Sequence, residues 1–247
     1  MKIKTIGIAA VLLLFITSFS SGCMLIDGVK GNGNITTEKR DVSNFNGIDI
    51  SNAFEVILKQ GNNESLTIEA DENLMGIIVT EVRGGVLKVY TDKHIRNPKS
   101  LKLFLTFKEI DFIDISGAVE LTSDGKLTFD KLEIDGSGAS EIDLEIEAKD
   151  LEMEFSGASE IKLKGKILDV EIDISGASEI SAYNLETDFM DIDISGAAEA
   201  QVFVNKELNI EASGASSVRY KGNPNINQNT SGASSIKRYW SYFSKPS

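Results

Sequence analysis

The sequence has few of the residues that build metal centres and disulfides. Its 247 residues include one cysteine, one histidine, one tryptophan and three prolines. A lone cysteine excludes an intramolecular disulfide, and one cysteine with one histidine excludes a Cys/His zinc site. The scarcity of proline argues against a long linker. Hydrophobic residues make up 41% of the chain, which is enough to build a core.

Positive charge is scarce as well. Lysine and arginine total 25 against 38 aspartates and glutamates, so the net charge is −13, and it becomes −15 if Lys2 and Lys4 leave with a cleaved leader. An acidic surface repels phosphate backbones, so no nucleic acid partner is expected. Gly31-Asn32-Gly33 is followed by neither a lysine nor a predicted helix, so it is not a phosphate loop. We interpret it as part of a flexible tether.

The N-terminus predicts export and lipid attachment. Two lysines precede an apolar run at 6–19, which is too short to span a bilayer as a helix. Ser20-Ser21-Gly22-Cys23 follows and resembles a bacterial lipobox. In such signals the leader is cut just before the cysteine, which carries a diacylglycerol. The resemblance therefore implies a signal peptide at 1–22 and lipid attachment at Cys23, and an ordinary signal peptide with a chance cysteine is the alternative.

Lipid on Cys23 predicts the cell envelope as the location. Several acyl chains on one residue anchor a protein stably, whereas a single chain does not. Met24 stands where some lipoproteins of the inner membrane carry an aspartate, so the outer membrane is favoured. The sequence leaves open whether the protein faces the periplasm or the outside of the cell.

An internal repeat dominates the rest of the chain. Ser-Gly-Ala occurs seven times at spacings of 18 to 21 residues, and Ser51-Asn52-Ala53 is a degenerate earlier copy. Glycine permits a positive φ at a tight bend, so we interpret each tripeptide as the corner of one structural unit. The predicted corner glycines are Gly117, Gly138, Gly157, Gly176, Gly196, Gly214 and Gly232.

The residues between the corners alternate between apolar and polar, as in Ile172-Asp173-Ile174 and Ile192-Asp193-Ile194. Alternation with period two predicts strands with one buried face. A strand-rich unit of about 19 residues cannot bury that face alone, whereas stacked units bury it against one another. The predicted fold is therefore all-β, a parallel β-solenoid or β-helix-like stack of such coils with an N-terminal β-rich capping region. An antiparallel sandwich or meander is the alternative.

The flanking regions are expected to cap the stack. The predicted segments are a signal peptide (1–22), a lipid anchor and tether (23–44), a β-rich segment that starts the stack (45–110), the Ser-Gly-Ala solenoid (111–237) and an aromatic C-terminal cap (238–247). In the last segment four aromatic residues predict packing on the final coil, and an aromatic binding patch is the alternative. These residues are Tyr239, Trp240, Tyr242 and Phe243.

The β-rich segment has one ambiguous stretch. Gly84-Gly85 predicts a turn between strands at 77–82 and 86–90. The alternative is one short helix over 72–82 with Asp71 as its N-cap. Both descriptions place this stretch near the first coil, where an open end of the solenoid must be covered.

With the repeats in view, the chain resembles a family of bacterial envelope proteins, the auto-transporter adhesins with a head GIN domain, which are common in Bacteroidetes. The resemblance covers about 45–237 and continues through the serial Ser-Gly-Ala corners. It implies a β-solenoid-like fold and a lipid-anchored or secreted protein, and it brings no catalytic or binding residues. It rests on Phe45-Asn46-Gly47-Ile48, Phe54-Glu55-Val56, Gln60-Gly61, Glu69-Ala70-Asp71-Glu72-Asn73-Leu74 and Thr80-Glu81-Val82.

Stacked coils would turn two acidic repeat positions into columns. Carboxylates about 5 Å apart repel by roughly 1 kcal/mol in water, so a column needs a solvated face or counter-ions. A solvated face is the favoured interpretation, and calcium bridging between the columns is the alternative, since calcium takes several carboxylate oxygens. Two residues before the corner serines lie Asp114, Asp135, Glu154, Asp173, Asp193 and Glu211. Four residues after them lie Glu120, Glu141, Glu160, Glu179 and Glu199.

No catalytic residue is predicted. Glycosidases need two carboxylates in different environments, and here the carboxylates are many and nearly equivalent. His94 lies outside the repeats, so the corner serines have no histidine base. Trp240 is the one tryptophan, and it lies in the tail, which argues against sugar binding by aromatic stacking.

Three function classes follow. A non-enzymatic surface scaffold or adhesin is favoured over an envelope lipoprotein that binds a glycan or a cation, and both are favoured over a polysaccharide-active enzyme. No cofactor and no metal centre are expected. The expected partners are the membrane, through lipid on Cys23, and a glycan or protein of the cell surface, while the oligomeric state is left open.

Overall fold

The computed structural model describes residues 28–239, and strands make up nearly all of this part of the chain. The strands of the repeat region wind in successive coils between two sheets. They are β10 (Phe112–Gly117), β11 (Glu120–Ser123), β12 (Leu127–Thr128), β13 (Lys131–Gly138), β14 (Glu141–Gly157), β15 (Glu160–Gly176), β16 (Glu179–Gly196), β17 (Glu199–Ala212), β18 (Ser217–Gly222), β19 (Asn225–Thr230) and β20 (Ser235–Arg238).

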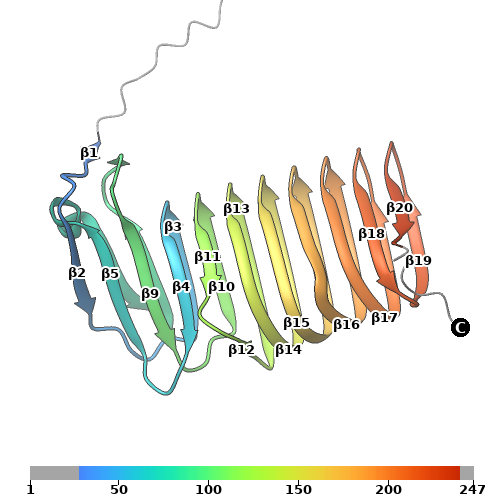
Figure 1. Cartoon of the computed structure of the whole chain (residues 1–247), viewed down its shortest axis with the longest axis horizontal. Coiled ribbons are helices and arrows are strands. Elements are labelled where there is room, and N and C mark those ends of the chain that lie inside the picture. The colour runs from blue at the N-terminus through green and yellow to red at the C-terminus, as the bar shows by residue number, and fades with distance from the viewer. Residues whose placement is uncertain (1–27, 240–247) are drawn as a thin grey trace, which may run out of the picture.

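The coils stack in parallel about 19 residues apart and form a β-solenoid of about seven turns. Each of the long strands β14 to β17 serves both sheets, because its first half pairs in one sheet and its second half in the other. Figure 1 shows the coils side by side along the long axis, with β19 and β20 at the far end. The predicted fold class is confirmed.

We call the two sheets sheet 1 and sheet 2. Sheet 1 contains β10, β13, the second halves of β14 to β17, and β19. Sheet 2 contains β11, β12, the first halves of β14 to β17, β18 and β20. The Ser-Gly-Ala corner carries the chain from sheet 1 to sheet 2 in every coil.

The N-terminal region closes the other end of the stack. Its elements are β1 (Val29–Lys30), β2 (Ile35–Arg40), β3 (Gly47–Asn52), β4 (Glu55–Gln60), β5 (Ser65–Asp71), the 3-10 helix η1 (Glu72–Ile77), β6 (Ile78–Arg83), β7 (Val86–Thr91), β8 (Ile95–Arg96) and β9 (Leu101–Phe107). The coil of β3 and β4 lies between the later coil of β7 and β9 and the first repeat coil.

Antiparallel strands cover this end. β6 pairs antiparallel with β7 in sheet 1, while β5 pairs antiparallel with β9 in sheet 2 and carries β2 on its outer side. Reversal of the strand direction stops the parallel stack and shields its first coil. Figure 1 shows β2, β5 and β9 in succession at this end.

Two expectations for this region need correction. The predicted tether at 23–44 is too long, because β1 pairs with β8 and β2 pairs with β5 inside the folded region. The predicted helix over 72–82 is limited to η1, and the turn at Gly84-Gly85 connects β6 to β7 as expected. Both glycines of that turn have a positive φ. The side chain of Asp71 does not cap η1.

The core lies between the two sheets and consists of inward side chains in register. One inner column of sheet 1 runs through Ile48, Ile113, Ile134, Met153, Ile172, Ile192 and Ile210, all buried. A full burial of such a side chain contributes about 1.5–3 kcal/mol. The next column shows how the packing adapts: Gly136 has no side chain where Phe155, on the adjacent strand, fills the space.

Candidate functional site

The Ser-Gly-Ala corners are the most regular part of the solenoid. All seven predicted corner glycines have φ values between 74° and 120°, a region that L side chains rarely adopt. The alanine N–H of each corner donates to the carbonyl of the preceding corner, as Ala177 does to Gly157 at 2.8 Å. A Cβ on Gly176 would overlap the carbonyl oxygen of Gly157. Both the bend and the close stacking therefore require glycine.

The degenerate copy at 51–53 is the first corner. Asn52 has a φ of 89° and pairs in register with Gly117. Its side-chain oxygen accepts the N–H of Thr91 at 2.9 Å. Asparagine tolerates this conformation better than most residues, and here its side chain also connects the corner to β7.

The first predicted column forms on the outer face of sheet 1. Asp114, Asp135, Glu154, Asp173, Asp193 and Glu211 pair residue by residue along the stack. Asp49 extends the column by one coil, and Lys88 ends it with an ion pair to Asp49. The lysine supplies the opposite charge that the first carboxylates need.

The second predicted column forms on the outer face of sheet 2. Glu120, Glu141, Glu160, Glu179 and Glu199 are in register in the same way. Glu55 extends this column, and Lys102 ends it at 2.6 Å from Glu55. The structure does not bring the two columns together, because the corners separate the two sheets. Among residues 28–239 no group of three or more acidic, histidine or cysteine side chains is placed to hold a metal ion.

The outer face of sheet 1 carries more acid than the predicted column alone. From β10 to β17 it presents thirteen carboxylates and a single lysine, Lys131. We call this surface the acidic face. Sequence reasoning missed the two neighbouring columns, although the same period of two residues would have found them. The added members are Glu133, Asp150, Glu152, Asp169, Glu171, Asp191 and Glu207.

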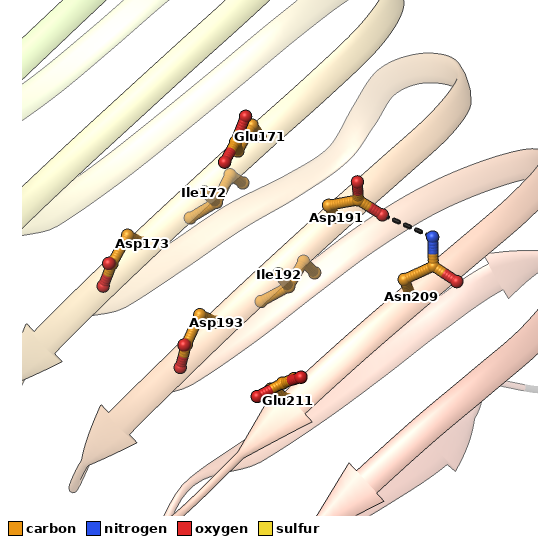
Figure 2. A pocket seen from close by; sticks show the side chains of 8 residues that line it. All are labelled: Glu171, Ile172, Asp173, Asp191, Ile192, Asp193, Asn209 and Glu211. Atoms are coloured by element: carbon orange, nitrogen blue, oxygen red, sulfur yellow. Dashed lines mark hydrogen bonds between the residues drawn. The ribbon is translucent and has the colours of Figure 1, made fainter.

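A shallow depression lies in the middle of the acidic face. Figure 2 shows the carboxylates of adjacent strands aligned around it, with the side chain of Asn209 donating to Asp191 at 2.5 Å. Its lining residues are Glu171, Ile172, Asp173, Asp191, Ile192, Asp193, Asn209 and Glu211. The depression offers several oxygen acceptors to a ligand that carries positive charge or N–H groups.

Repulsion between neighbouring carboxylates adds to the effect of burial on the pKa at the start of the first column. Burial raises the pKa of Asp114, and the charge of Asp49 raises it further, although Lys88 opposes this effect. Burial also raises the pKa of Asp135, with added repulsion from Glu154 and Asp114. At Asp114 and Asp135 the neighbouring carboxylates therefore make the side chain harder to ionise.

The outer face of sheet 2 balances its charge. Lys162 lies 2.7 Å from Glu160 and 3.3 Å from Glu141, and Arg219 forms an ion pair with Glu199. Lys166 lies 3.7 Å from Glu186 on the next coil. The two faces of one solenoid thus differ: sheet 2 pairs its acids with bases, whereas sheet 1 leaves them mostly to solvent.

Two further predicted features lie at the ends of the described region. His94 is exposed in a loop beside β8, and its backbone carbonyl accepts the N–H of Val29 at 2.8 Å. Tyr239 packs on Tyr183 with ring centroids 5.2 Å apart, and Lys221 lies over the Tyr183 ring at 4.3 Å. Cys23, the leader, Trp240, Tyr242 and Phe243 lie outside the described residues.

Asp71 is a buried carboxylate that sequence reasoning assigned only to a helix cap. Its oxygens accept the N–H groups of Gly33, Lys99 and Ser100, so it joins the entry to β2 to the start of β9. Burial alone would raise the pKa of this carboxyl, but the backbone hydrogen bonds outweigh burial and lower the pKa. No local sequence signal distinguishes it from the exposed aspartates.

The described residues therefore define a class of protein: a capped parallel β-solenoid with one acidic and one charge-balanced face. The chain belongs to the family described as "putative auto-transporter adhesin, head GIN domain", whose model matches residues 44–224. The resemblance drawn from the sequence motifs is confirmed. The sequence has no match among curated proteins.

Solved structures share the fold at low sequence identity. A putative adhesin from Bacteroides fragilis is 23% identical with a TM-score of 0.82, over 86% of this chain and all of that one. A putative lipid binding protein from Parabacteroides distasonis is 22% identical with a TM-score of 0.71, over 86% of this chain and 99% of that one. A putative adhesin from Parabacteroides merdae is 21% identical with a TM-score of 0.70 and the same coverage.

Family membership places this chain among adhesin-like proteins of the cell surface or envelope. Among the described residues no helix is long and apolar enough to cross a membrane.

Proposed function

We propose that this protein is a lipid-anchored, non-enzymatic envelope protein that acts as a scaffold or adhesin. The observation that supports this most is the pair of long sheet faces on which equivalent side chains recur coil after coil. Such a surface suits an extended partner, because every coil offers the same groups at the same spacing. Membership in an adhesin family agrees with this role.

The repetition also supports a non-enzymatic role. Carboxylate catalysis needs paired groups whose environments push their pKa values apart. On the acidic face three carboxyl groups have a shifted pKa, those of Asp114, Asp135 and Asp169, and all three are raised with burial as the leading cause. Neighbouring coils thus provide equivalent carboxylates, which suits multivalent contact better than acid–base chemistry.

An anchor on Cys23 would orient the solenoid. Gly28 is the fifth residue after Cys23, and an extended chain of that length spans at most about 18 Å. Gly28 enters β1, which pairs with β8 at the capped end of the stack. The capped end would therefore face the membrane, and the end with β19 and β20 would face away from it.

The partner that we propose is a glycan or protein of the cell surface. Binding of a glycan or a cation within the envelope is a second candidate, and the thirteen carboxylates of the acidic face favour it. A glycan array with the wild-type protein and with a Glu171→Gln, Asp173→Asn, Asp191→Asn variant tests whether the acidic face binds a glycan. Loss of array binding in the variant supports the ligand-binding candidate.

The anchor and the exposure can be tested in cells. We expect Cys23→Ala to abolish fatty-acid labelling and to move the protein from the membrane fraction to the soluble fraction. Protease treatment of intact cells should digest the wild-type solenoid if it acts outside the cell. Labelling that persists in Cys23→Ala would refute the anchor, and complete protection from protease would refute adhesion.

A further inference from the structure

The two-stranded sheet of β1 and β8 lies at the capped end of the stack, where Figure 1 shows β1. Its parallel register places Val29 beside Ile95 and Lys30 beside Arg96. Because side chains alternate along a strand, the two pairs lie on opposite faces of this sheet. The small sheet therefore has one apolar face and one cationic face.

The cationic face brings two like charges together without an acid. Lys30 and Arg96 are exposed, and within residues 28–239 neither forms an ion pair, whereas Lys88 at the same end does. The Nε of Arg96 donates to the carbonyl of Gly28 at 3.2 Å, which leaves the terminal N–H groups of the guanidinium without a partner among the described residues. Two neighbouring cations repel each other, so this face favours a bound anion.

The acidic residues close to this sheet do not supply that anion. A Cβ on Gly31 would lie 2.6 Å from the carboxylate of Asp71, but this carboxylate already accepts three backbone N–H groups. Asp92 is exposed in the loop before β8 and forms no ion pair with any described residue. The counter-ion of Lys30 and Arg96 is therefore not a carboxylate of the described chain.

A pocket of about 320 Å³ opens beside the cationic face. Lys30 and Arg96 line it together with His94, Ile95 and Asn97. None of these residues is acidic, in contrast to those that line the depression on the acidic face. The pocket thus offers several N–H donors and positive charge to an anionic group.

A second pocket, of about 260 Å³, adjoins the first, because His94 and Ile95 line both. Its apolar lining includes Ala53, Pro98 and Leu101. It also contains Asn52 and Thr91, and the N–H of Thr91 donates to the side-chain oxygen of Asn52 at 2.9 Å. Ligand pockets of this kind are mostly apolar with a few polar groups at one side.

The walls of the two pockets are held in place by backbone contacts. The N–H of Val29 donates to the carbonyl of His94 at 2.8 Å, and that of Gly31 donates to the carbonyl of Arg96 at 3.2 Å. A Cβ on Gly28 would overlap His94, so glycine is needed for this close approach. A ligand would therefore meet a site that is already formed, which lowers the cost of binding.

We infer that the capped end binds an acyl chain that carries an anionic head group. Lys30 and Arg96 bind the phosphate or carboxylate, with charge-assisted hydrogen bonds from the free N–H groups of the guanidinium. The acyl chain occupies the adjoining pocket at Ala53, Pro98 and Leu101. This binding is non-covalent, so it does not depend on lipid attachment at Cys23.

Photolabelling with two probes tests the inference. One probe is phosphatidylglycerol with a diazirine on its acyl chain, presented in phosphatidylcholine vesicles, and the other is dodecanoate with the same group, in solution. The protein is the full chain with Cys23→Ala, so that it carries no covalent lipid, and every variant has this background. We expect peptide mass spectrometry to locate the label within 52–53 and 91–101.

Two variants remove the two halves of the site separately. Lys30→Gln with Arg96→Gln removes the contacts to the head group, and it should raise the probe concentration for half-maximal labelling about tenfold or more. Ala53→Trp fills the apolar pocket from an exposed position, and we expect a similar loss of labelling. The control, Lys108→Gln with Lys237→Gln, removes the same charge from two exposed lysines outside the site and should label like the parent protein.

Labelling by only one of the two probes supports the inference and identifies the source of the lipid as the bilayer or the solution. Equal labelling of all four proteins, or an equal loss in the control, would overturn it. Labelling as strong with a phosphatidylcholine probe would show that the head-group charge plays no role. Normal labelling of Ala53→Trp beside loss in Lys30→Gln with Arg96→Gln would show that the site binds an anion and no acyl chain, which also contradicts the inference.

Discussion

The repeat stack and the N-terminal cap are stabilised in different ways. In the stack every coil repeats the same corner, the same carbonyl contact and the same inner column, so each contact is supported by its copies. In the cap single groups connect distant segments, as Asp71 joins the entry to β2 with the start of β9. A defect in one coil of the stack therefore destabilises the adjacent coils, whereas a defect in the cap leads to local unfolding at one end of the solenoid.

Within the stack, we expect substitution of a corner glycine to cause the largest loss of stability. Gly176→Ala places a Cβ against the carbonyl oxygen of Gly157 at a φ of 118°. Strain at such a φ costs about 1–3 kcal/mol, and the overlap adds to it, so we expect the unfolding free energy to fall by roughly 3 kcal/mol or more. Chemical denaturation of the purified protein measures the change.

A glycine of the cap provides the control for this comparison. Gly76 in η1 lies outside the positive φ region and has open space around the position of a Cβ. Gly76→Ala should change stability by at most about 1 kcal/mol, in the stabilising direction if the added Cβ only restricts the unfolded chain. Similar losses in both variants would contradict the role assigned to the corners.

Within the cap, we expect substitution of Asp71 to cause the largest loss of stability. Asp71→Asn keeps the shape but turns one acceptor oxygen into a donor, which then faces the N–H of Gly33 or those of Lys99 and Ser100. A buried donor without a partner costs about 1–3 kcal/mol, so we expect a loss smaller than that of Gly176→Ala. Hydrogen exchange should rise in β2 and β9 and stay unchanged in β14 to β17. Uniformly faster exchange would show that cap and stack unfold as one unit.

The same contrast explains what the sequence could predict. Strands with period two, a fixed tripeptide and stacking logic are enough to place the coils and both acidic columns, because each copy confirms the others. The two extra columns of the acidic face follow from the same rule once the register is known, as Glu171 and Asp191 show. Because the pattern repeats, the strands of the stack and their outward side chains can be predicted from the sequence alone.

The cap offers no such redundancy. The coil of β3 and β4 sits between two coils that come later in the sequence, and nothing local at Gly47 or Glu55 encodes that order. The role of Asp71 depends on backbone N–H groups that are 28 and 38 residues away. Long-range pairing and buried hydrogen bonds of this kind leave no periodic signal, so the sequence alone places β2 in the tether.

The two regions should respond oppositely to acid. The folded pKa of Asp71 is below its ordinary value of 3.8, so its contribution is complete above that pH and is lost as the pH falls further. The folded pKa values of Asp114 and Asp135 are raised by burial first, so protonating them favours the fold as the pH falls toward 3.8. Denaturation measured in small steps from pH 7 to about pH 2.5 should show a gain as the pH falls to about 3.8 and a loss below it.

Substitutions show which residues cause the gain and which cause the loss in stability as the pH falls. Asp71→Asn should reduce the loss below about pH 3.8 and keep the gain. Asp114→Asn with Asp135→Asn should reduce the gain, to which Asp169 also contributes, and keep the loss. A loss at low pH that survives in Asp71→Asn would place the acid-sensitive contact elsewhere.

Within the stack the two faces should respond differently to loss of charge. Asp173→Asn with Asp193→Asn removes two neighbouring carboxylates from the acidic face, and relief of repulsion should stabilise the fold by about 1 kcal/mol or less. Glu141→Gln with Glu160→Gln removes two acids that share Lys162, so we expect no gain. Melting temperatures at low salt give the comparison, and an equal gain on both faces would show that the ion pairs of sheet 2 are not formed in solution.

The smallest expected effect is that of calcium. On a solvated acidic face, sodium chloride screens the repulsion and raises the melting temperature, and calcium at the same ionic strength adds little. A specific site would instead raise it by RT ln(1 + [L]/Kd), because only the folded state binds the ion. Asp173 and Asp193 lie on sheet 1 while Glu179 and Glu199 lie on sheet 2, so no single ion can bridge the two columns. A calcium shift of several degrees beyond matched salt, lost in Asp173→Asn with Asp193→Asn but retained in Glu179→Gln with Glu199→Gln, would instead assign a cation site to the acidic face alone.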